Sequence, residues 1–125
     1  MKLIIAIGTG SFFGGILRYL LSQFIQTKAL SDFPYGTFFV NIIGCFLIGL
    51  VYGLFERGNL ANEWRLFLAT GLIGGFTTFS AFSVESINLL RNGQVGYASI
   101  YIVSSVFIGL IATYIGLETI KLFGH

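Results

Sequence analysis

Residues able to interact with an ion are concentrated between Gly74 and Glu85. Two adjacent glycines, Gly74 and Gly75, are followed by Thr77 and Thr78 inside an apolar stretch. Glycine weakens a helix, and threonine hydroxyls compete for its backbone hydrogen bonds. The carbonyl and amide groups that a break exposes are tolerated at membrane depth only where protein, water or an ion meets them. We therefore interpret this stretch as a membrane helix broken at Gly74–Thr78, beside an ion pathway.

Aromatic and hydroxyl side chains follow the break. Phe79 and Phe82 lie three residues apart, so a helix places them on one face, with the hydroxyls of Ser80 and Ser83 beside them. The edge of an aromatic ring is positive and can line the path of a small anion. Ordinary core packing is the alternative, because the chain contains 14 Phe.

The two ends of the break differ in chemistry. A helix that ends at Gly74 directs carbonyl oxygens at the break, which suits a hard cation such as Na+, whereas a helix that restarts near Thr78 offers free N–H groups. In the preceding apolar stretch, the Asn41 amide can donate to an anion, although such asparagines also join helices. Thr37 lies four residues earlier on the same face, so the two could form a short polar lane.

Two charged residues accompany these groups. Arg18 either reaches the membrane surface, pairs with a carbonyl or carboxylate, or lines an anion vestibule. Glu85 lies toward the mouth of the pathway, and an intramembrane carboxylate is a candidate functional group. Pairing with Arg18 and capping of a polar cluster are equally open for Glu85.

The composition of the chain is that of an integral membrane protein. Of the 125 residues, 55% are hydrophobic and 10% are charged, whereas soluble domains carry about 25% charged residues. The length accommodates about four spans of roughly 20 residues. We predict a single all-α transmembrane domain, residues 1–125, with four helices at about 3–24, 36–55, 66–90 and 95–123. Loops are predicted at Gln26–Gly36, Glu56–Arg65 and Arg91–Gln94.

Other classes of function fit less well. A net charge of +2 is too small to indicate nucleic acid, and the single cysteine, Cys45, offers no disulfide. With His125 as the one histidine, the chain lacks the usual groups of an acid–base enzyme, so we predict that it is not an enzyme. A small dual-topology, proton-coupled multidrug exporter is the main alternative. It would need a carboxylate in the first span, where the charged residues are Lys2 and Arg18.

Basic residues are nearly balanced between the two sides of the membrane. The side that holds both termini carries Lys2, Arg57, Arg65 and Lys121. The opposite side carries Lys28 and Arg91, with Arg18 near the end of the first span. A fixed orientation needs an excess of Lys and Arg on one side. We therefore expect copies to insert in both directions and to pair as an inverted homodimer about a two-fold axis in the membrane plane.

The stretch from Gly71 to Glu85, GLIGGFTTFSAFSVE, strongly resembles the Fluc family of bacterial fluoride channels. Residues 34–41, PYGTFFVN, and residues 14–19, GGILRY, extend the likeness over nearly the whole chain. The resemblance implies an antiparallel, dual-topology homodimer in the bacterial inner (cytoplasmic) membrane. It also implies two pores that export cytoplasmic fluoride passively, down its electrochemical gradient, and a central structural Na+.

The resemblance further implies roles for individual residues. They are Phe79, Phe82 and Asn41 in the pore, Thr37, Ser80 and Ser83 as secondary polar contacts, Gly74 and Thr77 as carbonyl ligands of Na+ at the dimer interface, and Arg18 and Glu85 in the vestibules. The family's fourth span carries a tyrosine and two serines about one turn apart. Tyr101 and Ser105 match the first two, and Ser105 is predicted as a pore contact. Gly109 stands third, and the next hydroxyl is that of Thr113.

Overall fold

The computed structural model describes residues 1–123. Its elements are α1 (Lys2–Ala29), α2 (Tyr35–Glu56), α3 (Asn62–Arg65), the π-helix η1 (Leu66–Ile73), α4 (Gly74–Phe76), α5 (Phe79–Arg91) and α6 (Val95–Phe123). Four segments are long and apolar enough to cross a membrane, namely Lys2–Ala29, Tyr35–Glu56, Asn62–Arg91 and Val95–Phe123. The prediction of an all-α membrane protein with four spans is confirmed.

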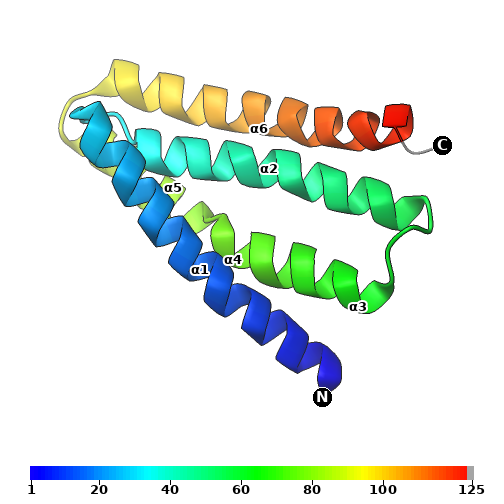
Figure 1. Cartoon of the computed structure of the whole chain (residues 1–125). Coiled ribbons are helices and arrows are strands. Elements are labelled where there is room, and N and C mark those ends of the chain that lie inside the picture. The colour runs from blue at the N-terminus through cyan, green and yellow to red at the C-terminus, as the bar shows by residue number, and fades with distance from the viewer. Residues whose placement is uncertain (124–125) are drawn as a thin grey trace.

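Close packing of small residues determines how the spans lie together. Helices α2 and α6 run side by side, and α1 packs along η1 and α4 (Figure 1). A Cβ atom on Gly116 of α6 would collide with the Phe46 carbonyl of α2, and one on Gly14 of α1 would collide with the Leu72 carbonyl of η1. Membrane helices use such small residues because lipid leaves little hydrophobic force to press them together. These contacts position α2, α6 and the third span around the site.

Thr77 and Thr78 separate α4 from α5. Their backbones are extended, with φ −90° and ψ 157° at Thr77 and φ −150° and ψ 121° at Thr78. The segment that precedes α4, η1, is π-helical, and short π-helical segments occur frequently at functional sites. The third span is therefore helical up to Phe76 and again from Phe79, with two extended residues between.

The first connection is shorter than the sequence predicted. Helix α1 continues to Ala29, past the expected start of the loop at Gln26, because the Gln26 side chain itself holds the connection. Its Nε2 donates to the carbonyls of Ser31 and Phe33 at 2.9 and 3.0 Å, and the Gly36 N–H donates to its Oε1 at 3.0 Å. The other two connections are also shorter, since helices include Glu56, Asn62–Arg65 and Arg91.

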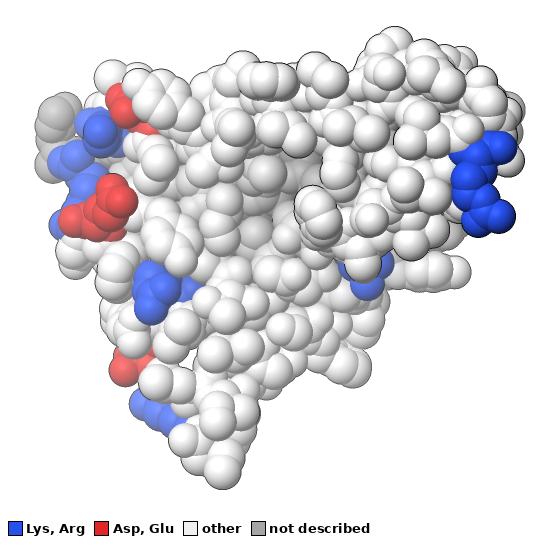
Figure 2. All heavy atoms as spheres, turned by 180° about the vertical axis from the view of Figure 1, so that it is seen from behind, with Lys and Arg blue, Asp and Glu red and all other residues white. Residues whose placement is uncertain are grey.

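The outer surface suits a lipid environment. Many large apolar side chains of α1 and α6 are exposed, including Phe12, Phe107 and Leu110. Figure 2 shows Lys, Arg, Asp and Glu mainly toward the margins of the viewed face, with a broad uncharged area between them. Buried apolar residues form two clusters among residues 1–123. One, near the first connection, contains Phe33, Leu89, Ala98 and Tyr101, and the other, between α2 and η1, contains Val51, Ala69 and Ile73.

Candidate functional site

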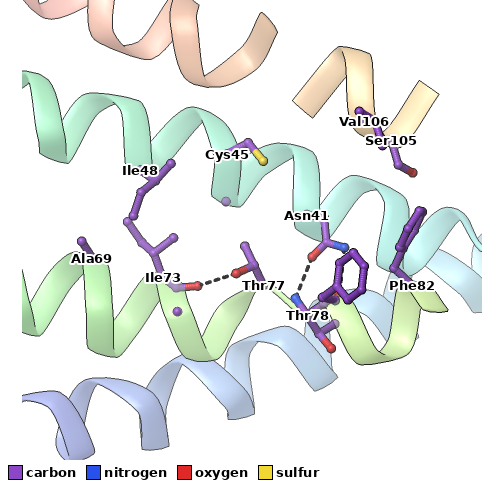
Figure 3. Close-up of a pocket in the computed structure, with 13 residues that line it drawn as sticks. Asn41, Cys45, Ile48, Ala69, Ile73, Thr77, Thr78, Phe82, Ser105 and Val106 are labelled. Atoms are coloured by element: carbon purple, nitrogen blue, oxygen red, sulfur yellow. Dashed lines mark hydrogen bonds between the residues drawn. The ribbon is translucent and has the colours of Figure 1, made fainter. Parts of the chain in front are cut away.

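A cavity of about 370 Å³ lies beside Thr77 and Thr78, with walls from α2, the third span and α6. Figure 3 shows side chains of all three walls directed around it. The predicted site residues that line it are Asn41, Gly74, Thr77, Phe79, Phe82 and Ser105. Those outside its lining are Arg18, Thr37, Ser80, Ser83 and Glu85. The cavity therefore brings together residues from three of the four spans.

Asn41 of α2 pairs with the backbone of Thr78 (Figure 3). Asn41 Nδ2 donates to the Thr78 carbonyl at 3.0 Å, and the Thr78 N–H donates to Asn41 Oδ1 at 2.9 Å. An amide group has two N–H donors, so one remains after this pairing. Asn41 thus joins two helices, one of the open alternatives, and keeps one donor at the cavity wall.

The hydrogen bonds around Thr78 also leave two backbone carbonyls, those of Gly74 and Thr77, without their usual helical donors. In a continuous α-helix the Thr78 N–H would bond to the Gly74 carbonyl, and the Ala81 N–H to the Thr77 carbonyl. The Thr78 N–H donates to Asn41 instead, and the Ala81 N–H donates to Thr78 Oγ1 at 3.2 Å. Gly74 and Thr77 therefore lack their α-helical donors, and both residues line the cavity.

Two phenylalanines form the aromatic part of the cavity. The ring centroids of Phe79 and Phe82 lie 5.6 Å apart with planes tilted by 49°. Phe82 also contacts the ring of Tyr101 at 5.1 Å. Phe79 is 80% exposed in the single chain. One ring is thus packed between helices, whereas the other lies open at the surface of the chain.

Ser105 brings an unpaired hydroxyl to the cavity. Its Oγ is buried and has no hydrogen-bond partner among residues 1–123. Ser104, its neighbour, instead donates to the Ile100 carbonyl. Thr113, the next hydroxyl considered in the sequence, donates to the Cys45 carbonyl at 3.0 Å and does not line the cavity. Thr113 therefore holds α6 to α2, and Ser105 supplies the hydroxyl at the cavity.

Glu85 caps a polar cluster between α2, α5 and α6. The Thr37 hydroxyl donates to Glu85 Oε1 at 2.7 Å, and the Tyr101 hydroxyl donates to Oε2 at 3.0 Å. Pairing with Arg18 does not occur, because Arg18 Nε donates to the Gly75 carbonyl at 3.3 Å. Glu85 also lines a second cavity of about 450 Å³ at the end of the molecule that contains the first connection. It therefore stands at the boundary between the protein interior and a polar opening.

Ser80 and Ser83 lie away from the first cavity. Both are exposed, and the Ser80 hydroxyl is 3.1 Å from Thr78 Oγ1. Their i, i+3 spacing places them together on α5, but that face differs from the one on which Phe82 reaches Tyr101. Ser80 thus bonds to the extended segment, and Ser83 faces outward in the single chain.

Three residues that were not among the predicted site residues help to build the site. Thr78 accepts the Asn41 bridge and its hydroxyl caps α5, Tyr101 holds Glu85, and Cys45 lines the cavity. Spacing contained a signal for two of them, since Tyr101 and Cys45 lie four residues from Ser105 and Asn41 respectively. The role of Thr78 depends on a partner 37 positions away, which spacing cannot reveal.

The fold and the cavity define a multi-pass membrane protein in which polar and aromatic groups meet between helices. Residues 5–117 match the family model described as CrcB-like protein, Camphor Resistance (CrcB). The chain therefore belongs to the CrcB-like family, which is also the Fluc family.

Three relatives illustrate the similarity. The chain is 49% identical over 122 residues to a protein of Flavobacterium psychrophilum named fluoride-specific ion channel FluC, covering 97% of this chain and 98% of the relative. Proteins with the same name from Phocaeicola vulgatus and Methylobacillus flagellatus are 45% and 44% identical, over 94% and 98% of this chain and 97% of each relative. These names belong to channels, which confirms the prediction that the chain is not an enzyme.

Proposed function

We propose that this protein is a fluoride-selective ion channel that exports cytoplasmic fluoride passively, down its electrochemical gradient. The observation that carries the proposal is the buried Ser105 hydroxyl, which has no partner among residues 1–123 and lines the cavity beside the two phenylalanines. A buried donor without a partner costs about 1–3 kcal/mol, and a small anion would remove that cost. The channel names of the relatives agree with this reading.

The remaining polar groups extend the path of the ion. The second Asn41 N–H and the edges of Phe79 and Phe82 present positive charge to the cavity. Farther on, the Thr37 and Tyr101 hydroxyls meet at Glu85. Fluoride would exchange water for these donors in turn, and the apolar walls would exclude larger hydrated anions. Arg18 and Glu85 would belong to the two vestibules.

We also propose a structural Na+ held by the backbone carbonyls of Gly74 and Thr77. Their donors are diverted to Asn41 and to Thr78 Oγ1, and oxygen ligands suit a hard cation. Within residues 1–123 no group of three or more His, Cys, Asp or Glu side chains could hold a metal ion. The bound ion would neutralise the carbonyl ends of η1 and α4. Exchange of Na+ for choline should lower the thermal midpoint of the purified protein, and exchange for K+ should do the same if the site is selective.

An antiparallel, dual-topology homodimer completes the proposal, with two pores and the Na+ at the interface. Two carbonyls from one chain leave a cation under-coordinated, and a second copy would supply two more. The 80% exposure of Phe79 also favours cover by another chain. Tags on the C-terminus should be accessible from both sides of the bacterial cytoplasmic membrane; access from one side alone would reject dual topology.

The channel proposal is tested by two adjacent serines. Purified wild type in liposomes should release fluoride, and Ser105→Ala should slow this release by about tenfold, because one donor to the ion is lost. Ser104→Ala is the matched control, since Ser104 bonds to the Ile100 carbonyl, and it should retain the wild-type rate. Equal rates for both variants would remove the support that Ser105 gives. Proton-coupled uptake of a cationic drug by the same vesicles would favour the multidrug exporter.

A further inference from the structure

Two lanes of residues at four-residue intervals face each other on helices α2 and α6, which pack side by side. The lanes are Thr37, Asn41 and Cys45 on α2, and Tyr101, Ser105 and Gly109 on α6. A four-residue interval keeps side chains on one helix face. The two lanes can therefore be compared in three levels, namely Thr37 with Tyr101, Asn41 with Ser105, and Cys45 with Gly109.

The first two levels join polar groups from both helices. Thr37 and Tyr101 donate to the two oxygens of Glu85. Asn41 and Ser105 line the same cavity. Each of these levels thus presents at least one hydrogen-bond donor from α2 and one from α6.

The third level pairs a thiol with a glycine. A Cβ atom built on Gly109 would lie 3.3 Å from Cys45 Sγ and 3.9 Å from Ile42 Cδ1. Gly109 is buried, and its missing side chain leaves room that the Cys45 sulfur approaches. The hydroxyl of Thr113, one turn farther along α6, is committed to the Cys45 carbonyl at 3.0 Å. Cys45 is therefore the polar side chain that this level provides.

Cys45 lines the cavity that contains the unpaired Ser105 hydroxyl. Cys45 and Ser105 both line it, and Figure 3 shows them on facing helices. The Cys45 thiol forms no disulfide within residues 1–123, and the Thr113 hydroxyl donates to the Cys45 carbonyl rather than to the sulfur. The S–H group is a weak donor and its sulfur is polarizable. An unpaired hydroxyl and a thiol thus come from two residues that line one cavity, one turn apart along the helix pair.

We propose that the Cys45 thiol is a further ligand for fluoride, following the Ser105 hydroxyl along the path of the ion. This inference rests on the proposed channel function. The thiol donates its S–H to the anion, and Gly109 leaves the space that this thiol needs. Cys45 then determines how well the ion is held after it leaves Ser105.

The test moves the polar group from α2 to α6. Cys45→Ala should slow fluoride efflux from liposomes about fivefold, the effect of losing one weak hydrogen bond. Cys45→Ala with Gly109→Ser should recover most of the rate, because the alanine removes the sulfur that a Gly109 side chain would meet at 3.3 Å. The matched control, Cys45→Ala with Gly109→Ala, fills similar space without a hydroxyl and should remain slow. Cys45→Ser should keep at least the wild-type rate.

Each outcome decides the proposal once size-exclusion profiles show that the variants fold. A wild-type rate in Cys45→Ala would overturn it. Recovery in both double variants would assign the effect to volume, and recovery in neither would assign it to packing by the thiol; both results also overturn it. Failure of the wild type to release fluoride would instead reject the channel function itself.

Discussion

The Asn41 side chain and the Thr78 backbone form a two-bond bridge between α2 and the start of α5, with N···O distances of 3.0 and 2.9 Å. The bridge resembles the pairing of two peptide groups, because an amide side chain places an N–H donor beside its carbonyl acceptor in the same plane. It satisfies the backbone of Thr78 and diverts its N–H from Gly74. Asn41 therefore maintains the extended segment as well as lining the cavity.

Asn41→Asp should abolish most fluoride efflux. A carboxylate can accept the Thr78 N–H, but it cannot donate to the Thr78 carbonyl, and its charge repels an anion in the cavity. We expect the rate to fall by more than about tenfold, with a lower thermal midpoint. Asn59→Asp, in the exposed connection after α2, is the control for added charge. An Asn41→Asp protein with the rate of the Asn59 variant would contradict this role.

Tyr101→Phe should weaken the cluster around Glu85. The substitution removes the hydroxyl that donates to Oε2 at 3.0 Å and leaves Thr37 as the hydroxyl donor. Loss of a hydrogen bond to a charged group costs about 1.5–3 kcal/mol, so both the unfolding midpoint and the efflux rate should fall. Tyr97→Phe is the control, because Tyr97 contacts Phe33 through its ring at 5.8 Å. Equal behaviour of the two variants would show that the Tyr101 hydroxyl is unimportant.

The sequence alone predicted those features that depend on residues close together in the chain. Hydropathy predicted four spans because each span is defined by its own residues, and the spacing of Phe79 and Phe82 correctly placed their rings near each other. The Asn41 bridge and the partners of Glu85 could not be predicted, because they depend on how α2, α5 and α6 lie together. The end of α1 was predicted too early, since Gln26 is helical and bonds to the loop through its side chain.

Gly116→Ala should destabilise the contact between α2 and α6. A Cβ atom at Gly116 would meet the Phe46 carbonyl and the Leu50 nitrogen, both backbone groups that cannot move aside easily. Overpacking of this kind costs about 1–3 kcal/mol. Gly96→Ala in the same helix has no neighbour within 4 Å and should leave the thermal midpoint unchanged or higher. Unchanged stability in the Gly116 variant would mean that the helices can separate slightly at no cost.

Gln26→Ala should loosen the first connection. It leaves the Ser31 and Phe33 carbonyls and the Gly36 N–H without their side-chain partner. We expect faster hydrogen exchange at Gly36 and a loss of about 2 kcal/mol in stability. The exposed Gln23 is the control, and Gln23→Ala should exchange at the wild-type rate. Slow exchange at Gly36 in the Gln26 variant would contradict the capping role.

The most direct measurement is the simultaneous release of fluoride and chloride from liposomes that hold the purified protein, with Phe79→Ile as the pore variant. The account predicts rapid fluoride release without chloride release in the wild type, and a large loss of fluoride release in Phe79→Ile, because an aliphatic side chain has no positive edge to offer an anion. Absence of fluoride release from well-folded protein, or equal release of chloride, would contradict a fluoride-selective channel.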